Sequence, residues 1–395
     1  MLLVQDGHQA HTGAREALDE EFVDGIIWSP ADHRPDHLLS CSSDEPFEDA
    51  VQGLDPQLYV ARLSDPNPKK LQDYELFSVP MRPRDLAARV LPGLVAGIMD
   101  YQAAIPDLTH LIAPTLAVPS MADRRAQSAA DLADATMAWK EGVEDDRPLL
   151  LSLALERSFL DDGDSVDGLL DEVTATDPDG FYLLFELPPD LDRERSATIR
   201  SRALYMVSAL AENEFEVWVG YAGMGAQCFR AAGAEAVASG WFQKQQHWSP
   251  GHWTGEGGGR QPKLRAYLAS TIGSLFLEAE LDPLRRADAE LYEEVLESPG
   301  PLAEELRNGR SPADADFSRS ECCLQMFATL AELESRNTGD LQVDLSRAYG
   351  DLEMAVDLLE RIEEAVQLHP LSGVRSVGAW LDAVSDVAGD LGIAL

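Results

Sequence analysis

The stretch LLLSLALE, residues 149–156, is an apolar run broken only by one serine, and it ends in a glutamate. The stretch FYLLFEL, residues 181–187, repeats this pattern with Glu186 near its end. Nearly continuous apolar runs of this length are typical of strands buried on both faces, as in a parallel sheet. Between them, residues 166–174 carry apolar side chains at helical spacing, which predicts a helix. This order indicates a strand–helix–strand unit.

Outward from this unit, the same alternation extends over the first 245 residues or so. The other predicted strands are residues 2–5, 25–28, 58–63, 110–115, 215–219 and 236–239. The other predicted helices are residues 84–101, 126–139, 196–211 and 224–232. Such repetition predicts an α/β fold, a closed (β/α)8 TIM-like barrel, over residues 1–247. The layout resembles (β/α)8 barrel enzymes as a class, which carry their chemistry at the carboxyl ends of the strands.

The rest of the chain reads differently. Residues 248–262 are rich in glycine and tryptophan and lack periodicity, which predicts a loop. Residues 263–395 read as almost wholly helical, with Pro262 in a first-turn position. The predicted helices are residues 288–296, 301–308, 321–335, 341–368 and 377–391. We therefore expect an all-helical C-terminal appendage that packs on the barrel or joins two copies into a homo-oligomer.

The composition and the first residues argue against several classes of protein. The sequence contains no apolar run of about 18 residues, so no membrane span is predicted. The first residues lack the basic segment of a signal peptide, so we expect a cytoplasmic protein. The four cysteines form no CxxC pair, which argues against a zinc ribbon.

The net charge of −39 comes from 70 acidic against 31 basic side chains. A dense carboxylate surface keeps a protein hydrated at high salt, so halophilic adaptation is one explanation. Mimicry of DNA or binding of a basic partner is the other, although the acids are spread along the whole chain. Either way, repulsion of phosphates disfavours nucleic-acid binding, which only a local basic groove would permit.

Carboxylates follow several predicted strands. Glu156 and Glu186 end consecutive strands, which lie about 4.8 Å apart in a sheet, so the two can form the acid and base pair of a glycosidic-bond enzyme. Asp6 and Asp32 follow the first two strands and are expected to orient the substrate. In a chain with 70 acids, some carboxylates also reach strand ends by chance.

Substrate-binding residues are predicted on the same rim. Glycine-rich turns after the last strands of a barrel often hold phosphate on backbone N–H groups, although their alternative use is a tight turn. Tryptophans near such a rim stack sugars and bases, or simply pin a loop to the molecule. The predicted set is Arg62, Asp65, Tyr221, Gly223, Gly225, Lys244, Trp241 and Trp248.

Histidines form a third group. His8, His11 and His33 lie early in the chain, and His247 follows the eighth predicted strand, which pairs with the first in a closed barrel. Imidazoles with nearby carboxylates suit a divalent metal such as zinc. The spacing matches no established metal motif, so exposed loop histidines are the competing interpretation.

Three hypotheses follow. The first is a hydrolase or glycosyl or ribosyl transferase that acts at a glycosidic or nucleoside-type bond of a small substrate through Glu156 and Glu186. The second is a metal-dependent hydrolase that uses the histidines. The third is a non-catalytic barrel whose helical C-terminus binds a protein partner.

Overall fold

The computed structural model describes residues 1–7, 10–63, 66–75, 81, 86–187, 192–241, 245–254, 266–269, 274–311, 318–369 and 372–395. Parallel strands form one sheet in the order β3-β2-β1-β9-β8-β7-β6-β4. Their bounds are β1 Leu2–Gln5, β2 Gly25–Trp28, β3 Val51–Leu54, β4 Leu111–Ile112, β5 Ala117–Val118, β6 Leu149–Leu155, β7 Gly180–Phe185, β8 Glu216–Gly220 and β9 Ala236–Gly240. Both β4 and β5 pair with β6, so they act as one interrupted strand and the barrel has eight strand positions.

The barrel is nearly closed between β3 and β4. There the backbone N–H groups of Thr109 and His110 both donate to the Gln52 carbonyl, at 3.0 and 3.1 Å. Gln52 N–H in turn donates to the Thr109 hydroxyl (2.9 Å). The predicted TIM-like barrel is confirmed.

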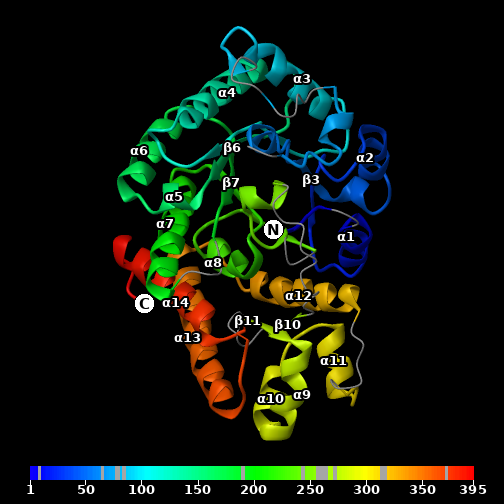
Figure 1. The fold of residues 1–395 in the computed structure, drawn as a ribbon, viewed down its shortest axis with the longest axis vertical. Helices are drawn as coiled ribbons and strands as arrows, with labels where there is room; N and C mark the ends of the chain where they lie inside the picture. The colour runs from blue at the N-terminus through cyan, green and yellow to red at the C-terminus, as the bar shows by residue number, and fades with distance from the viewer. Residues whose placement is uncertain are drawn as a thin grey trace.

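Helices surround the strands (Figure 1). They are α1 Ala10–Asp19, α2 Pro35–Ser42, α3 Leu91–Ala103, α4 Arg124–Glu141, α5 Arg157–Leu160, α6 Gly163–Val173, α7 Arg193–Glu212 and α8 Ala226–Ala231. Aspartates cap α4 and α7: Asp123 accepts from Arg125 N–H, and Asp192 accepts from Arg195 N–H. Such caps satisfy backbone donors that a helix leaves open at its start.

Alternate residues of the strands pack into two cores. Leu3, Ile27, Tyr182 and Trp218 belong to a cluster inside the barrel. Neighbours such as Leu2, Val4 and Phe181 belong to a second cluster, which extends between the strands and the helices and into the C-terminal region. This alternation follows from the two-residue period of a strand.

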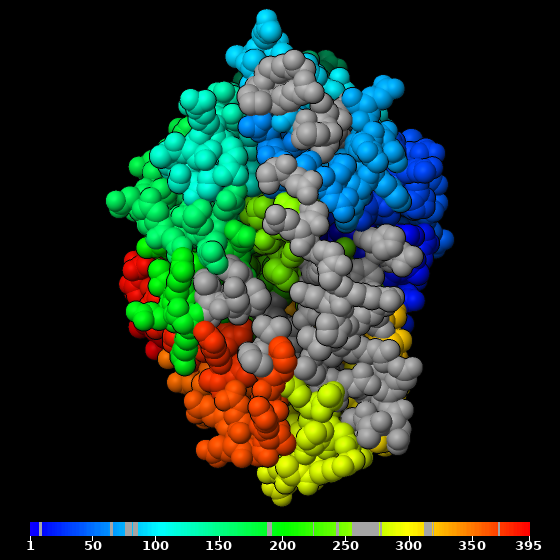
Figure 2. Space-filling view, viewed as in Figure 1, coloured from blue at the N-terminus to red at the C-terminus, as the bar shows by residue number. Residues whose placement is uncertain are grey.

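The C-terminal region contains α9 Glu278–Ala287, α10 Ala289–Val295, α11 Pro301–Arg307, α12 Arg319–Glu334, α13 Leu341–Ala365 and α14 Val374–Asp390. In the space-filling view these yellow to red segments form the lower end of the molecule, beneath the blue to green barrel (Figure 2). The helical appendage is thus confirmed. In the described residues, no helix has the length and hydrophobicity needed to cross a bilayer.

Two of these helices attach closely to the barrel. α12 packs against α1, α8 and β1, where the Cys323 thiol donates to the Trp241 carbonyl and Phe327 stacks on Trp241 with ring centroids 5.8 Å apart. α14 packs along α7, where the Arg200 guanidinium lies 4.5 Å from the Trp380 ring centroid and donates to the Ser376 carbonyl (2.7 Å). α12 therefore completes the helical layer beside the first strand.

Two sequence predictions were wrong. Residues 58–63 do not form the third strand; Leu58–Arg62 is a 3₁₀ helix, and the third strand is Val51–Leu54. The region after residue 263 also contains an antiparallel hairpin, with β10 Ala266–Ala269 paired to β11 Ser274–Leu277, where only helices were predicted. Pro262 and residues 255–261 lie outside the described residues.

A glycine substitution tests the tight pairing of β2 and β3. A Cβ atom added to Gly25 would overlap the backbone carbonyl of Val51 in the neighbouring strand, whereas one added to Gly93 in α3 would meet nothing within 4 Å. We expect Gly25→Ala to lower the free energy of unfolding by more than about 3 kcal/mol. Gly93→Ala should stay within about 1 kcal/mol of wild type. Urea unfolding of both variants makes the comparison, and equal stabilities would contradict the packing.

Candidate active site

Two glutamates lie side by side at the carboxyl ends of β6 and β7. The strands pair in register up to Leu155 and Phe185, and Glu186 N–H donates to the Leu155 carbonyl (3.0 Å). Glu156 and Glu186 are therefore neighbours across the sheet, as the sequence predicted. The two carboxylates also interact electrostatically, because the charge of Glu186 helps to raise the pKa of Glu156.

The two carboxylates have different surroundings. Burial is the main cause that raises the pKa of Glu156 above its ordinary value, against the opposing charge of Arg125, whose Nη1 lies 2.5 Å from Oε1. Glu186 instead accepts two hydrogen bonds, from the Arg157 backbone N–H (3.0 Å) and from the Ser249 hydroxyl (2.7 Å). A pair in different environments can divide the roles of acid and base.

A third carboxyl group, missed by the sequence analysis, lies inside the barrel. Asp55 directly follows β3 and is buried. Its oxygens accept hydrogen bonds from Gln57 N–H (2.9 Å) and from the Tyr59 hydroxyl (2.8 Å). Burial raises the pKa of Asp55 to about 6 despite these bonds. Placing the third strand at 58–63 hid this strand-end carboxylate.

Polar side chains connect Asp55 to the edge of the barrel. The Gln57 amide N–H donates to the Ser29 hydroxyl (2.9 Å), and the Ser29 hydroxyl donates to Asp32 (3.1 Å). Asp32 binds the half-exposed Lys69 ammonium at 2.7 Å. Asp32 thus lies in a buried network that leads from Lys69 toward Asp55.

Aromatic rings cover this network. Tyr59 contacts Trp248 and Trp253 edge-on, with centroids 5.6 and 5.3 Å apart, and Tyr221 contacts Trp253 at 6.1 Å. Tyr221 follows β8 with a φ of 54°, a left-handed conformation that is costly for a bulky residue. Its buried ring therefore stays at the mouth of the barrel at the expense of backbone strain.

The remaining predicted site residues pack against or bind other parts of the protein. Trp241 packs between α1 and α12 in the outer layer. Arg62 donates to the Met81 carbonyl (3.1 Å). A Cβ on Gly223 or Gly225 would overlap the Gln246 carbonyl or the Trp380 ring, so protein atoms fill the space beside both glycines. Their roles in substrate binding remain predictions.

Several histidines do meet, on the outer side of β1 and β2. The rings of His11, His33 and His37 lie 5.4 to 5.7 Å apart between centroids, and His33 Nε2 is 2.7 Å from Asp6 Oδ2. Burial lowers the pKa of His33, but the Asp6 and Asp32 carboxylates together outweigh burial and the net shift is upward. Asp6 thus lies against His33. His247, predicted to join this group, contacts the His252 ring at 4.8 Å.

The metal hypothesis stays a prediction. Among the described side chains, no three histidine, cysteine or acidic residues are placed so that they can hold an ion. His8, Asp65 and Lys244, which the sequence analysis also singled out, lie outside the described residues. The histidines that the structure describes do not fit a metal as placed, and we derive no catalytic step from one.

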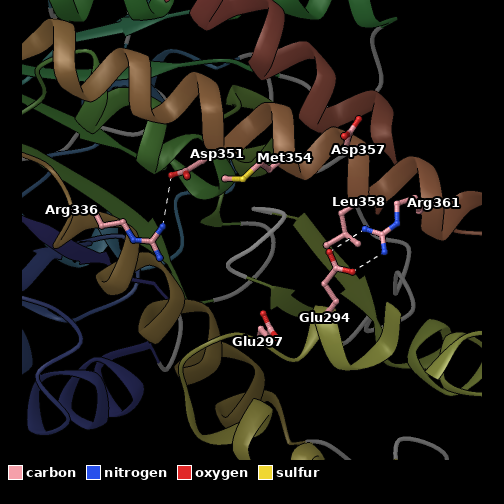
Figure 3. Close-up of a pocket in the computed structure, with 8 residues that line it drawn as sticks. All are labelled: Glu294, Glu297, Arg336, Asp351, Met354, Asp357, Leu358 and Arg361. Atoms are coloured by element: carbon pink, nitrogen blue, oxygen red, sulfur yellow. Dashed lines mark hydrogen bonds and ion pairs between the residues drawn. The ribbon is translucent and has the colours of Figure 1, made fainter. Parts of the chain in front are cut away.

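A pocket of about 360 Å³ lies among the C-terminal helices (Figure 3). The residues that line it are distant in sequence from those of the barrel mouth. Its guanidiniums are paired: Arg361 binds Glu294 at 2.8 Å, and Arg336 lies 3.8 Å from Asp351. Met354 is 63% exposed at its wall. None of the predicted catalytic residues lines it, so the barrel mouth remains the candidate active site.

Comparison with known proteins assigns this chain to no family. No family model, no curated protein and no solved structure matches this chain. The function therefore has to be argued from the site.

The pKa of Asp55 gives a test of the buried network. Because burial disfavours the charged carboxylate, the wild type loses stability relative to Asp55→Asn as the pH rises from about 4 to above 6. The change from 3.8 to about 6 corresponds to about 3 kcal/mol in total. Urea unfolding of both proteins at pH 4.5 and 7.5 should detect about 2 kcal/mol of it, because the unfolded carboxyl group is already mostly ionised at pH 4.5. A difference that does not change with pH would contradict the raised pKa.

Proposed function

We propose that this protein is an enzyme that breaks a glycosidic or nucleoside-type bond at the carboxyl end of the barrel. The observation that carries the proposal is the pair of adjacent strand-end carboxylates in unlike environments. Glu156 is the general acid, because burial favours its protonated form. Glu186 is the base or nucleophile, and the Arg157 backbone N–H holds it in place.

In a hydrolytic cycle, Glu156 gives its proton to the leaving atom as the bond to the anomeric carbon breaks. Glu186 either removes a proton from the attacking water or first bonds to the anomeric carbon. Water supplies the hydroxyl of the sugar product and one proton, so that both carboxyl groups return to their starting states. In a transferase, an acceptor hydroxyl or ring nitrogen replaces water.

Arg125 has a positioning role in this proposal. Its Nη1 touches Glu156 Oε1, and its Nε also lies 3.3 Å from Asp123. The guanidinium stabilises the glutamate charge that forms once the proton has been given away. Asp32, bound to Lys69, is the substrate-orienting carboxylate of this proposal, and Ser29 connects it to the hydrogen-bonded network.

Glu156→Gln tests the acid. With nucleosides or unactivated glycosides, we expect turnover to fall by at least about 100-fold, because proton donation is lost. The melting temperature should change little, since glutamine keeps the size of the side chain. Release of free base or reducing sugar measures the activity, with Glu172→Gln on the surface of α6 as the matched control.

Leaving groups separate the two glutamates. A nitrophenyl glycoside needs little protonation, so Glu156→Gln should recover much of its activity with this substrate, whereas Glu186→Gln should remain inactive. Full activity of Glu156→Gln toward unactivated substrates would remove Glu156 from the mechanism.

One measurement tests both the metal-dependent hydrolase and the non-catalytic barrel that binds a protein partner. Native mass spectrometry with and without a chelator reports both the bound metal and the number of subunits. A mass excess that the chelator removes, together with lost activity, would favour the metal-dependent hydrolase. A dimer that Met354→Glu dissociates would favour an interface on the C-terminal helices, where this side chain is exposed.

A further inference from the structure

Trp248 is an unusual residue for a connection between elements. Its side chain is completely buried and belongs to the cluster inside the barrel, together with Tyr59, Tyr182 and Tyr221. Its indole packs against the edge of Tyr59, whose hydroxyl binds Asp55. The segment after β9 therefore places a large planar ring among the polar groups of the barrel mouth.

Two buried donors in this region lack an acceptor among the described residues. One is the Trp248 Nε1–H, and the other is the amide nitrogen of Gln5, which lies in the same polar region. Gln5 is fully buried, and its amide oxygen accepts from the Tyr182 hydroxyl at 3.1 Å. Buried donors without acceptors are uncommon and destabilising, so the indole holds its buried position at a cost in free energy, and Gln5 Nε2 keeps an unused donor.

The next residue reaches the proposed catalytic pair. The Ser249 hydroxyl donates to Glu186 Oε1 at 2.7 Å, as a sugar hydroxyl of a substrate would. Ser249 also caps the short helix Pro250–Trp253 by accepting from Gly251 N–H. One dipeptide thus combines a planar ring against Tyr59, the hydrogen-bond partner of Asp55, with a hydroxyl on Glu186.

We infer that Trp248 and Ser249 occupy the substrate site, and that the Trp248 position is the subsite for the heterocyclic base of a nucleoside. The inference rests on the proposed function and narrows its substrate class. A heterocycle, unlike a plain aromatic ring, carries acceptors for buried donors such as Gln5 Nε2 and N–H donors for Asp55. Its sugar hydroxyl replaces Ser249 on Glu186, and the segment around Trp248 moves out when the nucleoside binds.

This arrangement lowers the apparent affinity for the base. A ligand that binds only when Trp248 has left is weakened by the fraction of molecules in that open state. Removing the indole should therefore strengthen binding. We expect Trp248→Ala to bind adenine or hypoxanthine at least tenfold more tightly than wild type in isothermal titration.

The matched control is Trp241→Ala. Trp241 is also buried, but it lies between α1 and α12, so its removal leaves a similar cavity outside the proposed site. Its affinity for the bases should equal that of wild type. Equal gains in both variants would reveal binding to any vacated indole cavity and would overturn the inference.

Ser249→Ala provides a test that does not depend on a large cavity. Loss of the bond to Glu186 should loosen the segment and strengthen base binding about threefold, whereas a hydroxyl that only positions Glu186 would leave base affinity unchanged. In wild type, adding a nucleoside should speed hydrogen exchange of the backbone amides of residues 248–254. Slower or unchanged exchange on saturation would overturn the displacement.

The outcomes of these experiments distinguish a failure of the base subsite from a failure of the proposed reaction. Base binding that improves in Trp248→Ala, without turnover of any nucleoside, would support the subsite and contradict the proposed reaction. Turnover that depends on Glu156, with base affinity unaffected by Trp248→Ala, would support the reaction and overturn the subsite.

Discussion

Closure of the strand ring depends on Gln52. Its backbone joins β3 to the segment before β4 through Thr109 and His110. Its amide accepts from the Trp28 indole (2.7 Å) and donates to the Ser42 and Phe47 carbonyls. A buried amide is stable only when such partners satisfy it, and here they also fix the direction of the chain as it leaves β3. Asp55, three residues later, has the opposite strand parity to Gln52 and Leu54 and therefore turns into the barrel.

Closure of the barrel also explains which strands could be predicted from the sequence. Strands β6 and β7 are almost entirely apolar because both of their faces are buried, so they were predicted with Glu156 and Glu186 in place. β3 could not be recognised, because closure requires Gln52 and a side chain at Gly53 would press against Ile112 and Trp218. Its four residues, VQGL, therefore lack an apolar run. The run at 58–63 is apolar because Leu58–Arg62 lines the barrel mouth.

The site was predictable only in part for a related reason. Strand-end positions follow from the sequence, but the choice of which side chain turns inward depends on the parity of each strand. Asp6 shares the parity of Leu2 and Val4 and contacts His33 in the outer layer, while Asp55 turns inward. The meeting of Ser249 with Glu186 joins residues 63 positions apart and has no local signal. Long-range placement of this kind comes from tertiary packing alone.

The position of α12 has a consequence for how the chain folds. This helix fills the layer beside α1 and β1, although a hairpin and three helices separate it from β9 in the sequence. Contacts such as Ser320 with Glu16 span 304 residues. During synthesis, the first strands must therefore wait with one apolar side uncovered until residue 334 has left the ribosome. Such long loop closures slow folding and leave the nascent barrel exposed to aggregation.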